Sequence, residues 1–173
     1  MTRRSRPAVL AGLLGAAALL LSSCTVPLPV VTFYGNRTAV DVEPGVWCQV
    51  DKAALTISCP PTPGTGTAGH LTMAPGQPLQ VNVPTEIGDD PWLVTFGYSD
   101  AAGKTQTGRT EVFTDGRLAY TLQSLPSGAQ LVRVEVDSGL VPTQATDGST
   151  VIAASRTWVL LISPKTVPPS TVP

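Results

Sequence analysis

Short stretches in which apolar and polar residues alternate run through most of the sequence, and turn residues separate them. In the clearest stretch, Trp92, Val94, Phe96 and Tyr98 occupy every second position. Successive side chains of a strand point to opposite faces of a sheet, so a period of two predicts a strand with one buried face. The same alternation occurs at 38–42, at Leu79, Val81 and Val83, at Leu118, Tyr120 and Leu122, and at Val132, Val134 and Val136, where Arg133, Glu135 and Asp137 are expected to face outward.

Glycine and proline lie between most of these stretches and exclude long helices. The chain holds 17 Pro and 16 Gly in 173 residues. Proline costs about 3 kcal/mol inside a helix, and only a turn near 52–55 remains as a helical candidate. We therefore expect an all-β fold of eight or nine short strands. A single antiparallel β-sandwich, immunoglobulin-like, is the preferred architecture, and a small barrel is the alternative.

The first 24 residues have the pattern of an export signal. Three arginines within 1–7 precede an uncharged run at 8–21, which has the length of a signal-peptide core and is shorter than the roughly 20 apolar residues of a spanning helix. The Leu-Ser-Ser-Cys sequence that ends at Cys24 resembles a bacterial lipobox. This resemblance implies that a diacylglyceryl group is attached to the Cys24 thiol and that cleavage makes Cys24 the first mature residue. An ordinary secretory signal and an uncleaved anchor are the alternatives.

Four segments follow from this interpretation: a signal peptide at 1–23, a lipidated tether at 24–29, the sandwich domain at 30–163 and a disordered Pro- and Thr-rich tail at 164–173. Loss of the signal peptide removes three arginines. The remaining chain carries eight basic and twelve acidic residues, a formal net charge of −4. Binding of nucleic acid through bulk positive charge is therefore excluded.

Two cysteines remain when Cys24 is lipidated. In an oxidising compartment Cys48 and Cys59 have one possible pairing, so we expect a structural disulfide. The alternative, a thiol redox or metal site, favours a C-x-x-C spacing, whereas ten residues separate these two. A bridge across this short loop is worth roughly 3 kcal/mol on the chain-entropy model.

Several segments together resemble one family. They are Val30-Val31-Thr32-Phe33-Tyr34, Trp47-Cys48-Gln49-Val50, Val81-Asn82-Val83-Pro84, Pro91-Trp92-Leu93-Val94, Phe96 and Tyr98, Cys59, and the run from Leu131 to Val136. The chain resembles, over most of 30–162, an uncharacterised family of actinobacterial secreted proteins and lipoproteins that is known only as a domain of unknown function. The resemblance implies a fold and an extracytoplasmic location. It supplies no catalytic residues.

Motifs that suggest enzymatic or metal chemistry lack their structural context. Gly64, Gly66 and Gly69 form a G-x-G-x-x-G sequence, but a dinucleotide site needs a strand before it and a helix after it, which the flanking prolines forbid. His70 and Met73 are too few for a copper site. A hydrolase would need at least two of five residues in one concave pocket; these are His70, Asp89, Asp90, Glu135 and Asp137.

The sequence favours a non-enzymatic binding or structural module of the cell envelope, with no cofactor and no metal. Its expected partners are the membrane, through the lipid anchor, and an unknown envelope protein or polymer. Loops around 60–70 and 138–150 are the expected contact regions. The alternatives are a small envelope hydrolase, or a carrier of an apolar ligand in which Trp92, Phe96 and Tyr98 line a cavity.

Overall fold

The computed structural model describes residues 27–51, 53, 56–59, 66–123, 125–144 and 147–165. The expected signal peptide at 1–23, Cys24, most of the expected turn at 52–55 and most of the tail at 164–173 lie outside these residues. No helix among the described residues is long and apolar enough to cross a membrane.

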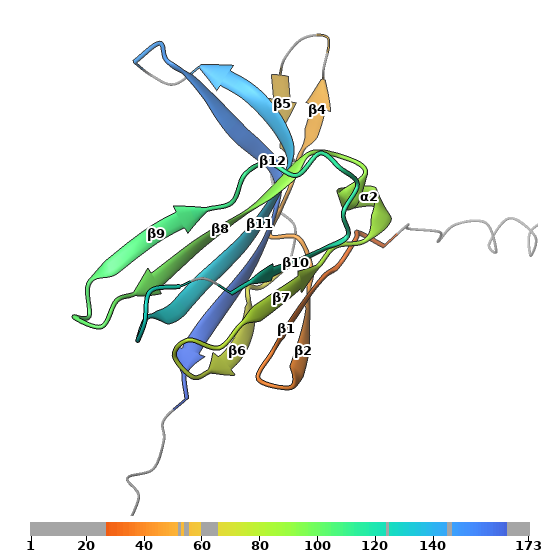
Figure 1. The fold of residues 1–173 in the computed structure, drawn as a ribbon. Coiled ribbons are helices and arrows are strands. Elements are labelled where there is room, and N and C mark those ends of the chain that lie inside the picture. Colours follow the sequence, from red (N-terminus) through yellow and green to blue (C-terminus); the bar gives the residue numbers. More distant parts are fainter. Residues whose placement is uncertain are drawn as a thin grey trace, which may run out of the picture.

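Two β-sheets form the domain and confirm the all-β prediction (Figure 1). The smaller sheet has the order β10-β7-β1-β2, and the larger has the order β3-β12-β11-β8-β9, with β6 also paired to β12. A hairpin of β4 and β5 is separate, and one turn of helix, α2, follows β7. The bounds are β1 Val31–Gly35, β2 Thr38–Val42, β3 Val46–Trp47, β4 Gln49–Asp51, β5 Thr56–Ser58, β6 Gly69–Met73, β7 Leu79–Asn82, α2 Thr85–Gly88, β8 Trp92–Ser99, β9 Thr105–Arg109, β10 Ala119–Leu122, β11 Gln130–Gln144 and β12 Thr150–Pro164.

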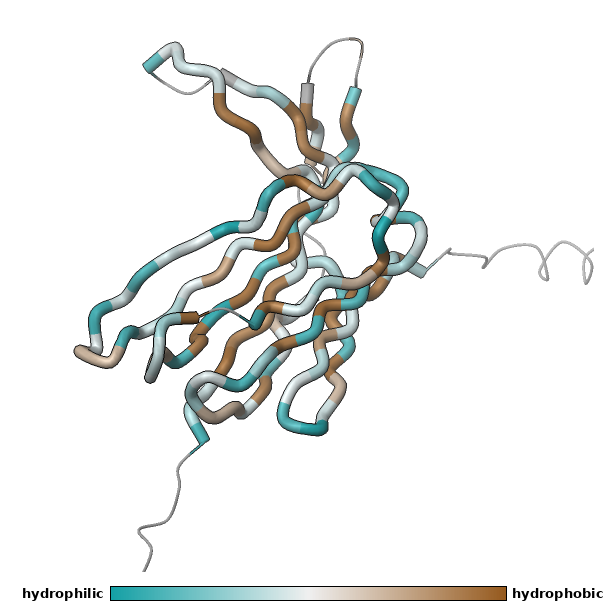
Figure 2. The backbone as a smooth tube through the Cα atoms, viewed as in Figure 1, coloured by the Kyte–Doolittle hydropathy of each residue, from teal (hydrophilic) through white to brown (hydrophobic). Residues whose placement is uncertain are grey.

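The core lies between the two sheets, where the inward positions of both meet. Hydrophilic and apolar residues alternate along the strands, as Figure 2 shows. The predicted face of β8 is correct, because Trp92 and Val94 are fully buried and Phe96 and Tyr98 pack against the core. Fully buried side chains from both sheets form the centre; they include Val31, Phe33, Leu79, Val81, Val134, Val136, Trp158 and Leu160. Burial of this apolar surface is the main source of stability.

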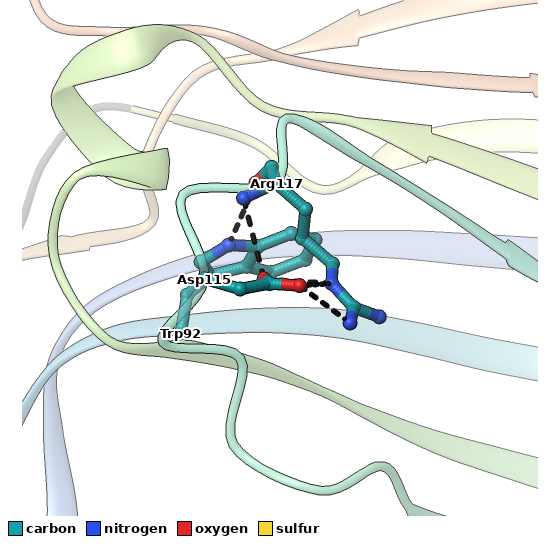
Figure 3. A network of polar contacts seen from close by, with 3 residues as sticks. All are labelled: Trp92, Asp115 and Arg117. Atoms are coloured by element: carbon teal, nitrogen blue, oxygen red, sulfur yellow. Dashed lines mark hydrogen bonds and ion pairs between the residues drawn. The ribbon is translucent and has the colours of Figure 1, made fainter.

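The segment between β9 and β10 closes one end of the core over Trp92. The Phe113 ring packs edge-on against the Trp92 ring, with 4.7 Å between centroids. The Trp92 indole N–H donates a hydrogen bond to the Arg117 carbonyl oxygen at 3.2 Å, and the Arg117 guanidinium pairs with Asp115 (Figure 3). That guanidinium also lies 4.4 Å from the centre of the Phe113 ring. The buried indole therefore has its polar partner, as a core tryptophan requires.

The sequence pattern misplaced two features of the larger sheet. The loop around 60–70 was expected to include Gly69 and His70, but both belong to the strand β6, which pairs in parallel with the end of β12. A side chain at Gly69 would lie 2.5 Å from Val42, so this glycine permits close packing of β2 on β6. Val132 was expected to face inward, but the pairing of β11 with β8 shifts between Leu131 and Arg133. This β-bulge buries Leu131 in place of Val132.

The outer halves of β11 and β12 leave the sandwich as a two-stranded arm (Figure 1). Pairing of β11 with β8 ends at Ser138, and beyond that position the described part of β11 pairs with β12 alone. The arm begins at Gly139, which has a φ of +61°. A side chain at Gly139 would lie 2.2 Å from the Ser155 hydroxyl, which donates a hydrogen bond to the Gly139 carbonyl oxygen. Most of the expected loop at 138–150 is therefore strand.

Candidate functional site

The outer face of the larger sheet places charged residues from three strands in neighbouring rows. Registers between β9, β8 and β11 define these rows. Side chains directly opposite one another on neighbouring strands are close enough to interact. One row contains Thr107, Gly97 and Arg133; the next contains Arg109, Thr95 and Glu135; the third contains Leu93 and Asp137.

A groove of about 450 Å³ follows the second and third rows toward the base of the arm. We call it the outer-face groove. Its lining is both polar and apolar, because Ile152 and Leu140 of the arm line it together with the charged residues of the rows. Ile152 is 59% exposed, the most exposed of the large apolar side chains among the described residues. The residues that define the groove here are Thr95, Arg109, Glu135, Asp137, Leu140 and Ile152.

Asp137 is the most perturbed acid in the groove. The pKa of Asp137 is raised to about 6, mainly by burial and in smaller part by the neighbouring Glu135 carboxylate. The Thr95 hydroxyl donates a hydrogen bond to Asp137 Oδ2 at 3.2 Å and opposes the shift. Arg133 pairs with Glu135. Asp137 therefore changes its charge near neutral pH, within reach of any ligand in the groove.

The prediction that Arg133, Glu135 and Asp137 share the outward face is correct. Arg133 is exposed, and the two acids are half-buried. Both acids also line one groove, so two of the five hydrolase candidates lie in a concave site. They are two positions apart on one strand and project from the same face, so they cannot flank a scissile bond from opposite sides as glycosidase carboxylates do.

The other three candidates lie elsewhere. His70 is exposed on β6, and Asp89 is exposed at the end of α2. Asp90 forms an ion pair with Arg156 at 3.2 Å, and the Arg156 guanidinium lies 4.7 Å from the centre of the Trp47 ring. These contacts give Asp90 a structural role at the base of the arm.

The expected disulfide is present. Cys48 and Cys59 are bonded, and they hold the β4–β5 hairpin beside the arm. The Cys48 N–H donates a hydrogen bond to the Ser155 carbonyl oxygen at 2.8 Å, which ties this bridge to β12. Cys48 is buried and Cys59 is exposed. Cys24 lies outside the described residues, so its lipidation stays a prediction.

The aromatic residues of the carrier interpretation belong to the packed core. Trp92 contacts Phe113, and Phe96 stacks with Tyr98 at 6.4 Å between centroids. The apolar-carrier interpretation therefore gains no support from these residues. Gly66 and Gly69 of the G-x-G-x-x-G sequence lead into the strand β6, and a dinucleotide site would need a helix there. Within the described ranges, no three His, Cys, Asp or Glu residues are grouped to hold a metal ion.

Thr95 and Arg109 are residues of the outer-face groove that the sequence did not single out. Thr95 lies on the strand that alternation predicts, and Arg109 lies on the next strand, β9. Their neighbours in the groove come from other strands. The only sequence signal is the outward alternation of β8, in which Leu93, Thr95 and Gly97 take every second position. Cross-strand register was needed to bring Arg109 beside Thr95.

Comparison with known proteins gives a family and no function. A family described as "Protein of unknown function (DUF2771)" matches residues 26–163, which is most of the chain. No curated protein and no solved structure matches the chain.

Proposed function

The chain belongs to the DUF2771 family, and for this member we propose a role as a non-enzymatic binding module, anchored by lipid to the outer face of the cytoplasmic membrane. The outer-face groove is the proposed binding surface, and an envelope protein or polymer is the proposed partner. The observation that carries this proposal is the arrangement of charges of both signs and apolar side chains along one groove.

The groove is built on paired strands, which favours recognition of a ligand by a preformed surface. Thr95, Glu135 and Asp137 project from strands that are hydrogen-bonded to neighbours on both sides. Little conformational entropy is lost when such side chains bind a ligand. Mixed charge gives specificity, because a mismatched partner leaves a charge unpaired.

The described residues before β1, 27–30, form an N-terminal stem. This stem supports a position of the domain close to the membrane. The Trp158 indole N–H donates a hydrogen bond to the Pro29 carbonyl oxygen at 3.0 Å, which fixes the stem to the domain. Pro29 is only five positions after Cys24, and five residues span less than about 20 Å when fully extended. A lipid on Cys24 would therefore hold the domain near the membrane surface, where two acyl chains give a stable anchor.

Crosslinking in intact cells tests the binding role. We expect a recurrent adduct with the native protein, and we expect an Asp137→Asn, Glu135→Gln double variant to lose most of it. The matched control is Asp41→Asn, because Asp41 lies on the other sheet and also accepts a hydrogen bond from a threonine hydroxyl, that of Thr32, at 2.6 Å. Equal adduct yields in all three proteins would refute the groove as the binding surface.

Membrane fractionation tests the anchor separately. Cys24→Ala should release the protein from the membrane fraction or leave an uncleaved precursor, because the thiol that receives the lipid is lost. A Cys24→Ala protein that still matures and sediments with membranes would contradict the anchor and leave the groove proposal intact.

One observation favours a second candidate function, a small envelope hydrolase. Asp137 has a pKa near 6 in a groove that also holds Glu135, and a carboxyl group with such a pKa can act as a general acid or base. Release of fragments from purified cell envelopes by the native protein, lost in Asp137→Asn, would support hydrolysis. Equal release by both proteins would exclude Asp137 as its catalytic residue.

A further inference from the structure

Gly97 lies in the middle of β8, a central strand, although neither the backbone nor the packing requires a glycine there. Its φ is not among the positive values of the described glycines. A side chain at Gly97 would meet Val132 at 3.7 Å, the Gln106 carbonyl oxygen at 3.8 Å and Arg133 at 3.9 Å. All three are ordinary van der Waals contacts. A glycine inside a strand weakens it, and such a residue often marks a β-bulge, such as the one on β11 opposite Gly97, or a place where a ligand approaches the backbone.

The neighbouring glycine on β9 shows the contrast. A side chain at Gly108 would lie 2.6 Å from the Phe96 ring, so packing on the inner face explains Gly108. No such contact explains Gly97, whose outer side forms the floor of a hollow of about 420 Å³. Arg109, Arg133, Thr95 and Thr107 line this hollow. We call it the Gly97 hollow; it shares Thr95 and Arg109 with the outer-face groove.

Two arginines flank the Gly97 hollow. Arg133 lies directly opposite Gly97 on β11, and Arg109 lies two residues from Thr107, which is opposite Gly97 on β9. Arg133 pairs with Glu135, yet half of its side chain stays exposed. Arg109 is exposed, and its guanidinium has no hydrogen bond or ion pair to any described residue. An arginine without an internal partner, beside an open hollow, is available for a ligand.

We propose that the Gly97 hollow binds an anionic group, a carboxylate or a phosphate, of the envelope component that occupies the groove. Guanidinium groups present paired N–H donors that match both anions, and Thr107 adds a hydroxyl donor. Without a side chain at Gly97, the anion can approach the sheet between the two arginines. This inference rests on the proposed binding role of the outer face but not on the lipid anchor.

Charge along the outer face supports this direction of binding. The arginines lie at the end of the face near Gly97, whereas Asp137 and Glu111 line the other end of the outer-face groove, and Glu135 between them is paired with Arg133. A ligand that placed its anionic group toward Asp137 would meet like charge. Binding with the anionic group over Gly97 avoids this repulsion.

Nuclear magnetic resonance titration of the full chain in detergent, with inorganic phosphate and with acetate at constant ionic strength, tests the inference. We expect saturable shifts of the Gly97, Thr107 and Gly108 amides, with chloride as the reference. Arg109→Gln should weaken the apparent affinity at least threefold, and Arg37→Gln, at an exposed turn of the other sheet, should leave it unchanged. Response to both anions indicates general anion recognition; response to one identifies its source as phosphate or carboxylate.

Gly97→Val gives the sharpest result, because it fills the hollow with a residue that favours strands. We expect loss of the phosphate and acetate shifts with no fall in the thermal midpoint. Unchanged binding in Gly97→Val or in Arg109→Gln, or equal weakening in Arg37→Gln, would overturn the inference. Envelope crosslinks that depend on Asp137 but survive Gly97→Val would refute the anion site alone, whereas anion binding without any crosslinked partner would refute the proposed function alone.

Discussion

Replacement of Asp137 by asparagine isolates the energetic effect of ionising a carboxyl group in the groove. Asparagine has nearly the same shape, and its carbonyl oxygen can still accept the hydrogen bond that Thr95 donates. The substitution removes the charge that burial and Glu135 disfavour. The other charged groups near this position stay in place: Arg133 on β11, with Arg109 and Glu111 along the groove.

The sign of the effect follows from the direction of the shift. The pKa of Asp137 is raised to about 6 in the folded state, against about 3.9 in an unfolded chain. The folded state therefore holds this proton more tightly, and its stabilising contribution is complete below pH 4 and is lost as the pH rises through 6. A pKa difference of about two corresponds to about 3 kcal/mol in the free energy of unfolding. Solvent screening of a half-buried group reduces this contribution to about 1–1.5 kcal/mol.

Urea denaturation at pH 4.5 and pH 7.5 measures this contribution. We expect Asp137→Asn to be more stable than the native protein by about 1 kcal/mol at pH 7.5 and by only about a third of that at pH 4.5. The pKa values of Asp100, Asp115 and Asp147 are lowered by hydrogen bonds, and their effects cancel because both proteins share them. A native-like pH profile for Asp137→Asn would show that ionisation of Asp137 does not change the stability of the fold.

Three further variants test other contributions to stability. Gly139→Ala should lower the unfolding free energy by about 2–4 kcal/mol, because the position has a positive φ and the new side chain would contact Ser155. The loss should be smaller in a Ser155→Ala background. Chemical denaturation measures both losses, and equal losses would exclude the contact as a cause. Cys48→Ser with Cys59→Ser should cost about 3 kcal/mol, seen as a lower thermal midpoint that reductant no longer changes. Phe113→Ala should cost about 3–5 kcal/mol, and a loss below 1 kcal/mol would show that the Trp92 contact adds little.

Much of the fold could be predicted because alternation is a local signal. Trp92, Val94 and the residues after them mark their strand without knowledge of its neighbours. The bulge at Val132 could not be predicted, since a bulge appears only when one strand is aligned with its partner. The strand β6 was missed for a related reason. It follows a Pro- and Gly-rich stretch, and its pairing with β12 joins residues about ninety positions apart.

Less of the candidate site could be predicted, because a site on a sheet is made across strands. The outward positions of Glu135 and Asp137 followed from alternation, and both line the groove. Arg109 is brought beside Thr95 by register alone. The disulfide followed from counting cysteines. The raised pKa of Asp137 depends on burial by neighbouring strands, which alternation within one strand does not reveal.

The position of β12 has a consequence for the order of folding. Its central residues, Arg156 and Thr157, pair with β3, and its last residues, Leu160–Pro164, pair with β6, while its other edge pairs with β11. Neither β3 nor β6 has another strand partner in the larger sheet. Contacts between such distant residues close large loops and slow folding. The larger sheet therefore cannot be completed until β12 has emerged from the ribosome, and until then β3 and β6 lack the strand that joins them to this sheet.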